Sequence, residues 1–329
     1  MTQQPARRHH LVPRFYLARF ARQQTIRRRA LGSESSHPLS INDATVRNRF
    51  YTISYNERED DSFETQFLNG IERPASDSLC RILDNGQWPL SSEDRNNISW
   101  WVALQFIRGS DARQSQEEIY RSVATLEVGT FTTEQIRERL NLSSDVADED
   151  VENIRERMLA TADTFQVDHH FHLSTILRSL PEILPLVQRR SWSLISFERK
   201  SLGTSDSPLV LIPGSDVDLR TSGVGLGTAA ELYIPLSRRV ALLMGSLDSD
   251  DRSRSVPGTT AIAKKLNQHI LYSAHTCVFH HPDDNPFDGL VVPSPRQRQV
   301  DTSRKQIHEI ANKFARNQGR SSPFPNSDE

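Results

Sequence analysis

Cysteine is scarce in this 329-residue sequence, and long apolar runs are absent. Cys80 and Cys277 are too few for a disulfide framework or a cysteine-based zinc site, so we expect a reducing compartment. No segment approaches the roughly 18 consecutive apolar residues of a membrane span. The N-terminus also lacks the apolar stretch of a secretory signal. These absences favour a cytoplasmic protein that does not enter a membrane.

Several common catalytic motifs are absent from the sequence as well. It contains no Gly-x-Ser-x-Gly nucleophile elbow, no Walker loop and no set of kinase motifs. We therefore expect neither acyl-enzyme chemistry nor nucleotide triphosphate hydrolysis. The glycine-rich residues 223–227 do not open a helix after a buried parallel strand, which favours a flexible loop over a dinucleotide-binding site.

The charges are balanced in total but segregated along the chain. Forty basic residues face 42 acidic ones, yet residues 1–33 contain no acidic residue. Five of the basic residues are lysine and 35 are arginine. The planar fork of arginine suits phosphate and carboxylate groups, although a GC-rich coding sequence also explains the excess. We predict an N-terminal arm that binds nucleic acid or lies on acidic blocks of the protein itself, and its basic residues are Arg7, Arg8, Arg27, Arg28 and Arg29.

Length and periodicity predict an α+β protein. We expect a mainly helical N-terminal half, followed by a small, mostly antiparallel sheet with one further packed helix. These parts would form a single domain over residues 1–282, mainly helical over 9–188 and sheet-forming over 190–282. Residues 283–329 are rich in Pro, Asp and Arg, so we expect a polar, partly disordered tail there.

Local patterns place the elements more closely. Ser91 or Ser92 can cap a mostly buried helix that ends near Gly109, and Pro74 should kink or divide the helix from Phe63 to Leu83. Alternation predicts strands near residues 50–53, 192–197, 208–213, 232–235, 240–244 and 276–279. Apolar periodicity predicts further helices over residues 115–127, 132–140, 151–165, 173–180 and 259–274. Residues 248–258 should form a flexible insertion.

The most distinctive string is His9-His10-Leu11-Val12-Pro13, followed by Tyr16-Leu17 and Phe20. It resembles the start of a bacterial domain-of-unknown-function family, number 4238 (DUF4238). Similar motifs follow in the family's order to about residue 280: Phe50-Tyr51, Gly70-Ile71-Glu72, Leu104-Gln105-Phe106-Ile107-Arg108 with Arg113, Trp192, Thr204-Ser205-Asp206-Ser207-Pro208, Pro235-Leu236-Ser237 and Asn267. The resemblance implies a common fold and a set of candidate positions, but no reaction.

The sequence departs from the family's pattern in several places. His9 stands where the family usually has Gln. The basic run at 27–29, the insertion at 248–257 and the tail after 283 lie outside the pattern. A nucleic-acid role that depends on these segments would therefore be particular to this chain.

Polar residues inside apolar strings are the candidates for chemistry. His10, Glu72, Asp206 and Asn267 are the candidate catalytic residues, since imidazole and carboxyl groups act as acids, bases or ligands. Glu72 and Asp206 are also candidate ligands for a divalent cation such as Mg²⁺ or Mn²⁺. Four further residues would bind an anionic substrate: Arg14, Gln105, Arg108 and Arg113. The alternative is structural: His10 caps a helix, Glu72 pairs with Arg81 or Arg108, and Asp206 closes its own turn.

Two functional hypotheses follow from these residues. The first is a hydrolase, in particular a metal-dependent nuclease, that acts on nucleic acid or another phosphate ester. The second is a non-catalytic module that binds nucleic acid or protein through the arginine-rich arm. The sequence does not indicate a homo-oligomer or a particular protein partner.

Three weaker sequence signals have simpler structural explanations. Glu198-Arg199-Lys200 has the Glu-x-Lys form of many nucleases, but no acidic partner precedes it on a strand. Asp168-His169-His170-x-His172 has metal-ligand spacing, yet a solvated helix junction is the simpler interpretation. His280-His281-Pro282-Asp283-Asp284 is typical of a strand that ends in a turn.

Overall fold

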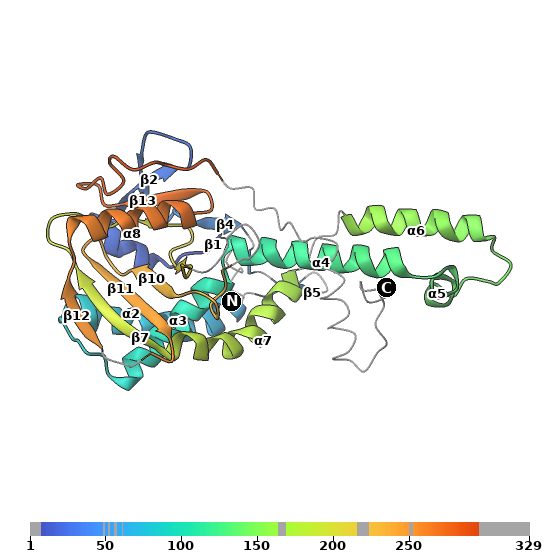
Figure 1. The fold of residues 1–329 in the computed structure, drawn as a ribbon, viewed down its shortest axis with the longest axis horizontal. Helices are drawn as coiled ribbons and strands as arrows, with labels where there is room; N and C mark the ends of the chain where they lie inside the picture. The colour runs from blue at the N-terminus through green and yellow to red at the C-terminus, as the bar shows by residue number, and fades with distance from the viewer. Residues whose placement is uncertain are drawn as a thin grey trace. The chain divides into compact units, whose positions relative to one another are not determined.

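The computed structural model describes residues 8–48, 50–51, 53–55, 58–60, 62–163, 169–215, 224–249 and 253–295. They form two units. The first takes in the described residues of Met1–Ala112 and His169–Arg296, and the second takes in those of Arg113–Asp168. Figure 1 shows their helices and strands. The fold is α+β, as the sequence predicts.

A five-stranded sheet lies at the centre of the first unit. Its strands run in the order β12-β7-β11-β10-β9, and all neighbours are antiparallel except β12 and β7. The five strands are β7 (Arg190–Ser196), β9 (Val210–Ile212), β10 (Glu231–Pro235), β11 (Val240–Leu247) and β12 (Arg254–Pro257).

Helices cover both faces of this sheet, because successive side chains of a strand point to opposite sides. One face packs with α2 (Asn69–Leu83), α3 (Ser92–Ile107) and α7 (His169–Gln188), through Trp192, Leu194, Leu232, Ile234, Leu242 and Met244. The other face packs with α8 (Thr260–Ser273), through Ile195, Val210, Tyr233 and Ala241. Figure 1 shows α8 on one side of the strands and α2, α3 and α7 on the other.

Strands also fill the N-terminal part of the chain, so the prediction of a mainly helical half over 9–188 is wrong in its first 50 residues. A four-stranded antiparallel sheet has the order β3-β2-β13-β8, with β2 (Thr25–Ala30), β3 (His37–Ser40), β8 (Thr204–Ser205) and β13 (Cys277–His280). Two-stranded ribbons pair β1 (Arg8–His10) with β4 (Val46–Asn48) and β5 (Ile53–Tyr55) with β6 (Arg58–Asp60).

Local patterns could not reveal these strands, for a physical reason. β2 has the sequence Thr-Ile-Arg-Arg-Arg-Ala, without apolar alternation, and its partner β13 lies about 250 residues further along the chain. The strand is therefore specified by its pairing with β3 and with the distant β13 rather than by its own composition.

The remaining helices of the first unit are short. α1 (Arg14–Leu17) continues into the 3₁₀ turn η1 (Ala18–Phe20), and the π-helix η2 (Phe63–Leu68) leads into α2. α4 (Ser110–Thr130) starts in the first unit and continues into the second, which also contains α5 (Thr133–Arg139) and α6 (Asp148–Asp163). Among the described residues, none of the helices combines the length and the apolar character that crossing a membrane requires.

Helix caps confirm two predicted boundaries. The hydroxyl of Ser91 accepts from the amide of Asp94 at 3.0 Å, and Thr259 caps α8 in the same way. The predicted end of α7 at Pro181 is wrong, since the helix continues through Pro181 and Pro185. A continuous buried face compensates for the hydrogen bonds that the two prolines remove; it consists of Leu173, Ile176, Leu180, Leu184 and Val187.

Segments expected to be loose also pack in the first unit. Within the region 248–258, residues 254–257 form β12 and pair in parallel with β7. Within the predicted tail, residues 283–295 are described, and Phe287 is buried in the smaller core. A Cβ on Gly203 would lie 2.1 Å from the Phe287 ring, so this close approach requires glycine. Residues 296–329 lie outside the described residues.

A tight turn between η1 and β2 carries backbone strain. Two hydrogen bonds of 2.9 Å join Arg22 and Thr25 around Gln23 and Gln24, whose φ angles are 48° and 68°. Such two-residue turns favour Asn-Gly, because glycine adopts positive φ without a Cβ penalty. Both glutamine side chains are exposed. The turn fixes where Arg22 leaves the backbone.

Replacing this pair with Asn-Gly (Gln23→Asn with Gln24→Gly) should raise the free energy of unfolding by about 1 kcal/mol, because the strain at both positions is relieved. Urea unfolding measures the difference. The control is Gln23→Asn with Gln24→Ala, which keeps a Cβ at positive φ and should gain less. Equal stability of the two variants would contradict strain as the cause.

Candidate functional site

A buried guanidinium joins α2 to the end of α3. The side chain of Arg108 has no exposed surface, and its Nη1 donates to Oε1 of Glu72 on α2. With its amide oxygen turned toward these donors, Gln105 accepts from Nε of Arg108 at 3.1 Å, from Nη2 at 2.7 Å and from Trp101 Nε1 at 3.2 Å. Because an unpaired buried charge is costly, these contacts fix the position of Glu72.

The π-helix η2 carries a second carboxylate toward β1. Nε2 of His9 lies 3.0 Å from Oε2 of Glu64, and Nδ1 of His9 accepts from the backbone amide of Tyr51 at 2.7 Å. Nδ1 is therefore unprotonated in this arrangement, and the neutral ring carries its hydrogen on Nε2. The imidazole of His9 is completely buried. π-Helical turns occur often at functional sites.

The hydroxyl of Tyr51 lies among these charged groups. The residue is completely buried, and its hydroxyl has no hydrogen-bond partner among the described residues. Burial raises the pKa of Tyr51 strongly. The charge of Arg108 opposes this rise, whereas those of Glu72 and Glu64 add to it. The phenol is therefore a neutral donor. A buried donor without a partner is unfavourable, so this hydroxyl is a polar group that the described protein atoms leave unsatisfied.

His10 differs from its neighbour His9 because it is only partly buried. Its Nε2 lies 3.2 Å from the carbonyl oxygen of Asn42. A carbonyl can only accept, so Nε2 carries the hydrogen and Nδ1 keeps a lone pair in the neutral imidazole. Burial lowers the pKa of His10 below 6.5, and the bond to Asn42 opposes this. The charges of Arg14 and Arg8 lower the pKa further, while that of Glu72 raises it.

Of the sequence candidates, Glu72, Gln105 and Arg108 contact one another, and the charges of Arg14 and Glu72 act on His10. We use the name His10 site for five residues: His10, Arg14, Tyr51, Glu72 and Arg108. Three further residues contact the site or its neighbours: His9 contacts Tyr51, Glu64 lies beside His9, and Gln105 contacts Arg108. His9, Tyr51 and Glu64 were not among the candidate site residues, although His9 and Tyr51 lie inside the quoted motifs.

A family model described as "Protein of unknown function (DUF4238)" matches residues 8–284. The chain belongs to this family. The matched residues include every member of the His10 site, and also Asp206 and Asn267. No curated protein matches the chain, and no solved structure does.

Asp206 makes contacts of another kind in this DUF4238 chain. Its carboxylate accepts from the amides of His275 (2.9 Å), Thr276 (2.8 Å) and Cys277 (3.3 Å), and from the Thr276 hydroxyl at 2.5 Å. These bonds attach the turn after β8 to the start of β13. The turn itself is closed by Ser205, whose Oγ accepts from the amide of Ser207 at 3.1 Å, rather than by Asp206.

Asn267 on α8 is also satisfied by its neighbours. The side chain is buried, its oxygen accepts from the amide of Gly203 at 3.0 Å, and its nitrogen donates to the carbonyls of Ser201 (2.9 Å) and Pro286 (3.2 Å). In the described residues no contact joins Asp206 or Asn267 to the His10 site. Their bonds are those of residues that hold loops in place.

The predicted basic arm is partly a strand. Arg27, Arg28 and Arg29 lie in β2, and Arg27 and Arg29 bond to the loop before β3 through Ser36 and Ser33. Arg8 lies in β1 and pairs with Asp43 at 2.5 Å, while Arg7 lies outside the described residues. Arg113 belongs to the second unit, where it pairs with Glu117 at 3.2 Å.

The metal candidates Glu72 and Asp206 contact different partners. In the part of the chain that the structure describes, no group of three or more His, Cys, Asp or Glu side chains could hold a metal ion. Of the weaker signals, Asp168 lies outside the described residues. Lys200 donates from Nζ to the carbonyl of Asn285 at 3.3 Å.

The pair Glu72–Arg108 should show a large coupling free energy. Glu72→Leu leaves the guanidinium buried without a counter-charge, so we expect a loss of about 3 kcal/mol in unfolding free energy. Glu72→Leu with Arg108→Met removes both charges and should be less destabilised than Glu72→Leu alone. Urea unfolding of the two single variants and the double variant measures the coupling. Additive losses would show that the pair does not anchor the site.

Proposed function

We propose that the His10 site hydrolyses a phosphate ester, with nucleic acid as the substrate and His10 as the general base. The observation that carries this proposal is the state of His10. Its Nε2–H is committed to the carbonyl of Asn42, and its lowered pKa keeps the imidazole neutral at pH 7. A neutral imidazole with a lone pair on Nδ1 can accept a proton from an attacking hydroxyl.

The charges around His10 suit an anionic substrate. Arg14 is exposed on the first turn of α1 and makes no hydrogen bond or ion pair with any described residue. Its charge lowers the pKa of His10. A guanidinium that is free to donate can bind a phosphate oxygen bidentately and stabilise charge that develops in the transition state.

Glu72 has a supporting role in this reaction. When His10 accepts a proton it becomes an imidazolium, and the nearby carboxylate of Glu72 stabilises that charge. Arg108 has no exposed surface and acts through Glu72 as a positioning residue, and Gln105 holds Arg108 in turn. These roles differ from the substrate-binding roles that the sequence suggested for Gln105 and Arg108.

The reaction needs one proton transfer to His10 and one proton transfer to the leaving oxygen. Nδ1 of His10 takes the proton from water, or from a hydroxyl of the substrate, as that oxygen attacks phosphorus. The bond from phosphorus to the leaving oxygen breaks, and that oxygen takes up a proton, from the imidazolium or from solvent. The described side chains supply imidazole, carboxylate and guanidinium for these steps.

A nuclease assay tests the proposal directly. His10→Gln should lower the rate of cleavage of a labelled RNA or DNA oligonucleotide by about 100-fold or more, because a general base contributes factors of that size. Reactions with EDTA, with Mg²⁺ and with Mn²⁺ would show whether a divalent cation is required.

His37→Gln is the matched control for this assay. His37 is an exposed histidine on β3, so its replacement should leave the rate unchanged. Cleavage by the His10→Gln variant at the wild-type rate would remove His10 as the base. Binding without cleavage by the wild-type protein would favour the alternative of a non-catalytic module.

A further inference from the structure

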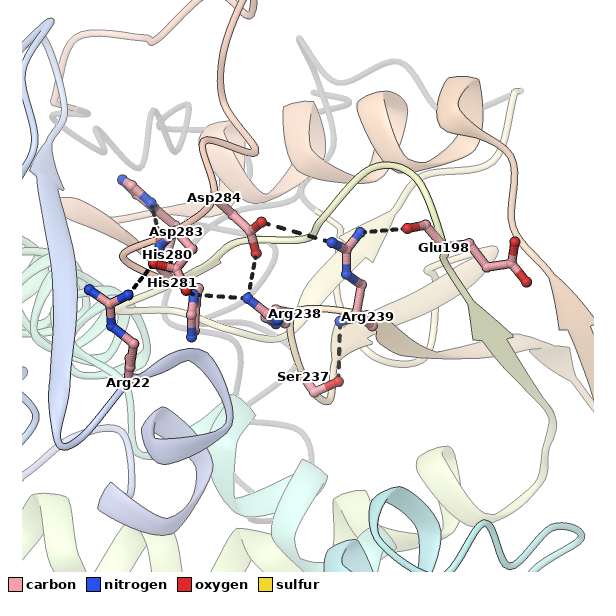
Figure 2. Close-up of polar contacts among 9 residues, drawn as sticks. All are labelled: Arg22, Glu198, Ser237, Arg238, Arg239, His280, His281, Asp283 and Asp284. Atoms are coloured by element: carbon pink, nitrogen blue, oxygen red, sulfur yellow. Dashed lines mark hydrogen bonds and ion pairs between the residues drawn. The ribbon is translucent and has the colours of Figure 1, made fainter.

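Three guanidiniums converge on two adjacent carboxylates, at residues that do not belong to the His10 site. Arg22 extends from the tight turn before β2, and Arg238 and Arg239 lie at the tip of the β10–β11 hairpin. Figure 2 shows all three pointing toward the loop that contains Asp283 and Asp284. We call Arg22, Arg238 and Arg239 the arginine row.

The backbone holds the hairpin tip rigidly. The hydroxyl of Ser237 accepts from the amides of Arg239 and Val240, both at 3.2 Å. The carbonyl of Arg238 accepts from the backbone amide of Leu202 at 2.9 Å, and the carbonyl of Arg239 accepts from the backbone amide of Phe197 at 2.8 Å. The two guanidiniums therefore project from a fixed base, which lowers the entropy lost when they bind an anion.

The two carboxylates neutralise the row incompletely. Asp283 lies 2.5 Å from Arg22, but Asp284 lies 3.3 Å from Arg238 and 3.9 Å from Arg239. Charge-assisted bonds usually measure about 2.7–2.9 Å, so Asp284 bonds weakly to Arg238 and only forms a long ion pair with Arg239. Arg239 donates its hydrogen bond to the carbonyl of Glu198, at 3.0 Å. Three positive charges face two negative ones, and the side chains of Arg22, Arg238 and Arg239 remain 60%, 37% and 36% exposed.

His281 adds no negative charge to this cluster. Its Nδ1 accepts from Arg238 at 2.9 Å and from the amide of Asp283 at 3.2 Å, so the imidazole is neutral in this arrangement. Burial is the main reason that its pKa is lowered. Arg238 and Arg22 lower it further, while Asp283 and Asp284 raise it.

We propose that the arginine row binds the phosphate backbone of nucleic acid, and that Asp283 and Asp284 occupy the row when no nucleic acid is present. Carboxylates on adjacent residues present two successive negative charges, as neighbouring phosphates do along a strand. A phosphate carries more acceptor oxygens than a carboxylate and can engage Arg238 and Arg239 more closely. The choice of nucleic acid as partner rests on the proposed function.

Asp283 can release Arg22 without unfolding of the loop. Phe287 is buried, and the carbonyl of Pro286 accepts from Asn267 at 3.2 Å, so the chain is anchored directly after the two aspartates. Asp283 is 48% exposed, and its carboxylate can turn toward solvent by side-chain rotation. Asp283 can therefore leave Arg22 by exchange of an ion pair rather than by a change of fold.

Binding of labelled 20-nucleotide single-stranded RNA and DNA, followed by fluorescence anisotropy in the His10→Gln background, tests this surface. Asp283→Asn with Asp284→Asn should tighten binding by about 10-fold and steepen the salt dependence, since two competing charges are removed. Adding Arg22→Ala should reverse most of the gain. Arg22 is the most exposed member of the row, so this variant is the least disruptive to the fold.

The control removes the same charge elsewhere. Asp84 and Asp248 are exposed partners of Arg19 and Arg189, and Asp84→Asn with Asp248→Asn should change affinity less than twofold if location matters. An equal gain from both double variants, or no gain from the first, would overturn the proposal. The anisotropy assay measures binding and the nuclease assay measures cleavage, so the two proposals can fail separately. The arginine row can fail while His10 remains the base, and His10 can fail as the base while the row still binds nucleic acid.

Discussion

The buried guanidinium of Arg108 is the constraint on which the His10 site depends. A charge with no exposed surface must be matched, and Glu72 and Gln105 supply the acceptors. This requirement ties the end of α3 to the start of α2 and leaves the Glu72 carboxylate close enough to act on both His10 and Tyr51. The neutral state of His10 then follows from its own burial and from the neighbouring arginines, which together outweigh the bond to Asn42 and the charge of Glu72.

The sequence predicted the fold best where local physics determines the structure. Ser91 and Thr259 cap the helices as expected, and the strands from 190 to 247 follow their alternation. It predicted poorly where partners are distant: β2, rich in arginine, lies between β3 and the distant β13 and pairs with both. Pro181 does not end α7, because burial of one continuous helix face outweighs the local penalty of proline.

The sequence could not separate candidate catalytic residues from residues that hold loops in place, for a related reason. His10, Glu72 and Asp206 are all polar residues in apolar strings, and their surroundings in sequence do not distinguish a reactive group from one that holds a loop. Asp206 accepts hydrogen bonds from three backbone amides, whereas Nδ1 of His10 keeps a lone pair that is not used in a hydrogen bond among the described residues. Tyr51 and Glu64 gave no separate signal, because their importance comes from a π-helical turn and a buried hydroxyl. The arginine row likewise combines turns separated by more than 200 residues.

The state of the His10 ring tests this account most directly. Nuclear magnetic resonance of ¹⁵N-histidine-labelled protein, titrated with pH, reports the tautomer and the pKa of each ring. We expect His10 to carry its hydrogen on Nε2, to titrate below 6.5, and to titrate lower still in Glu72→Gln, because the carboxylate raises its pKa. A His10 ring protonated on Nδ1 in its neutral form, or one that titrates at or above 6.5, would contradict the account.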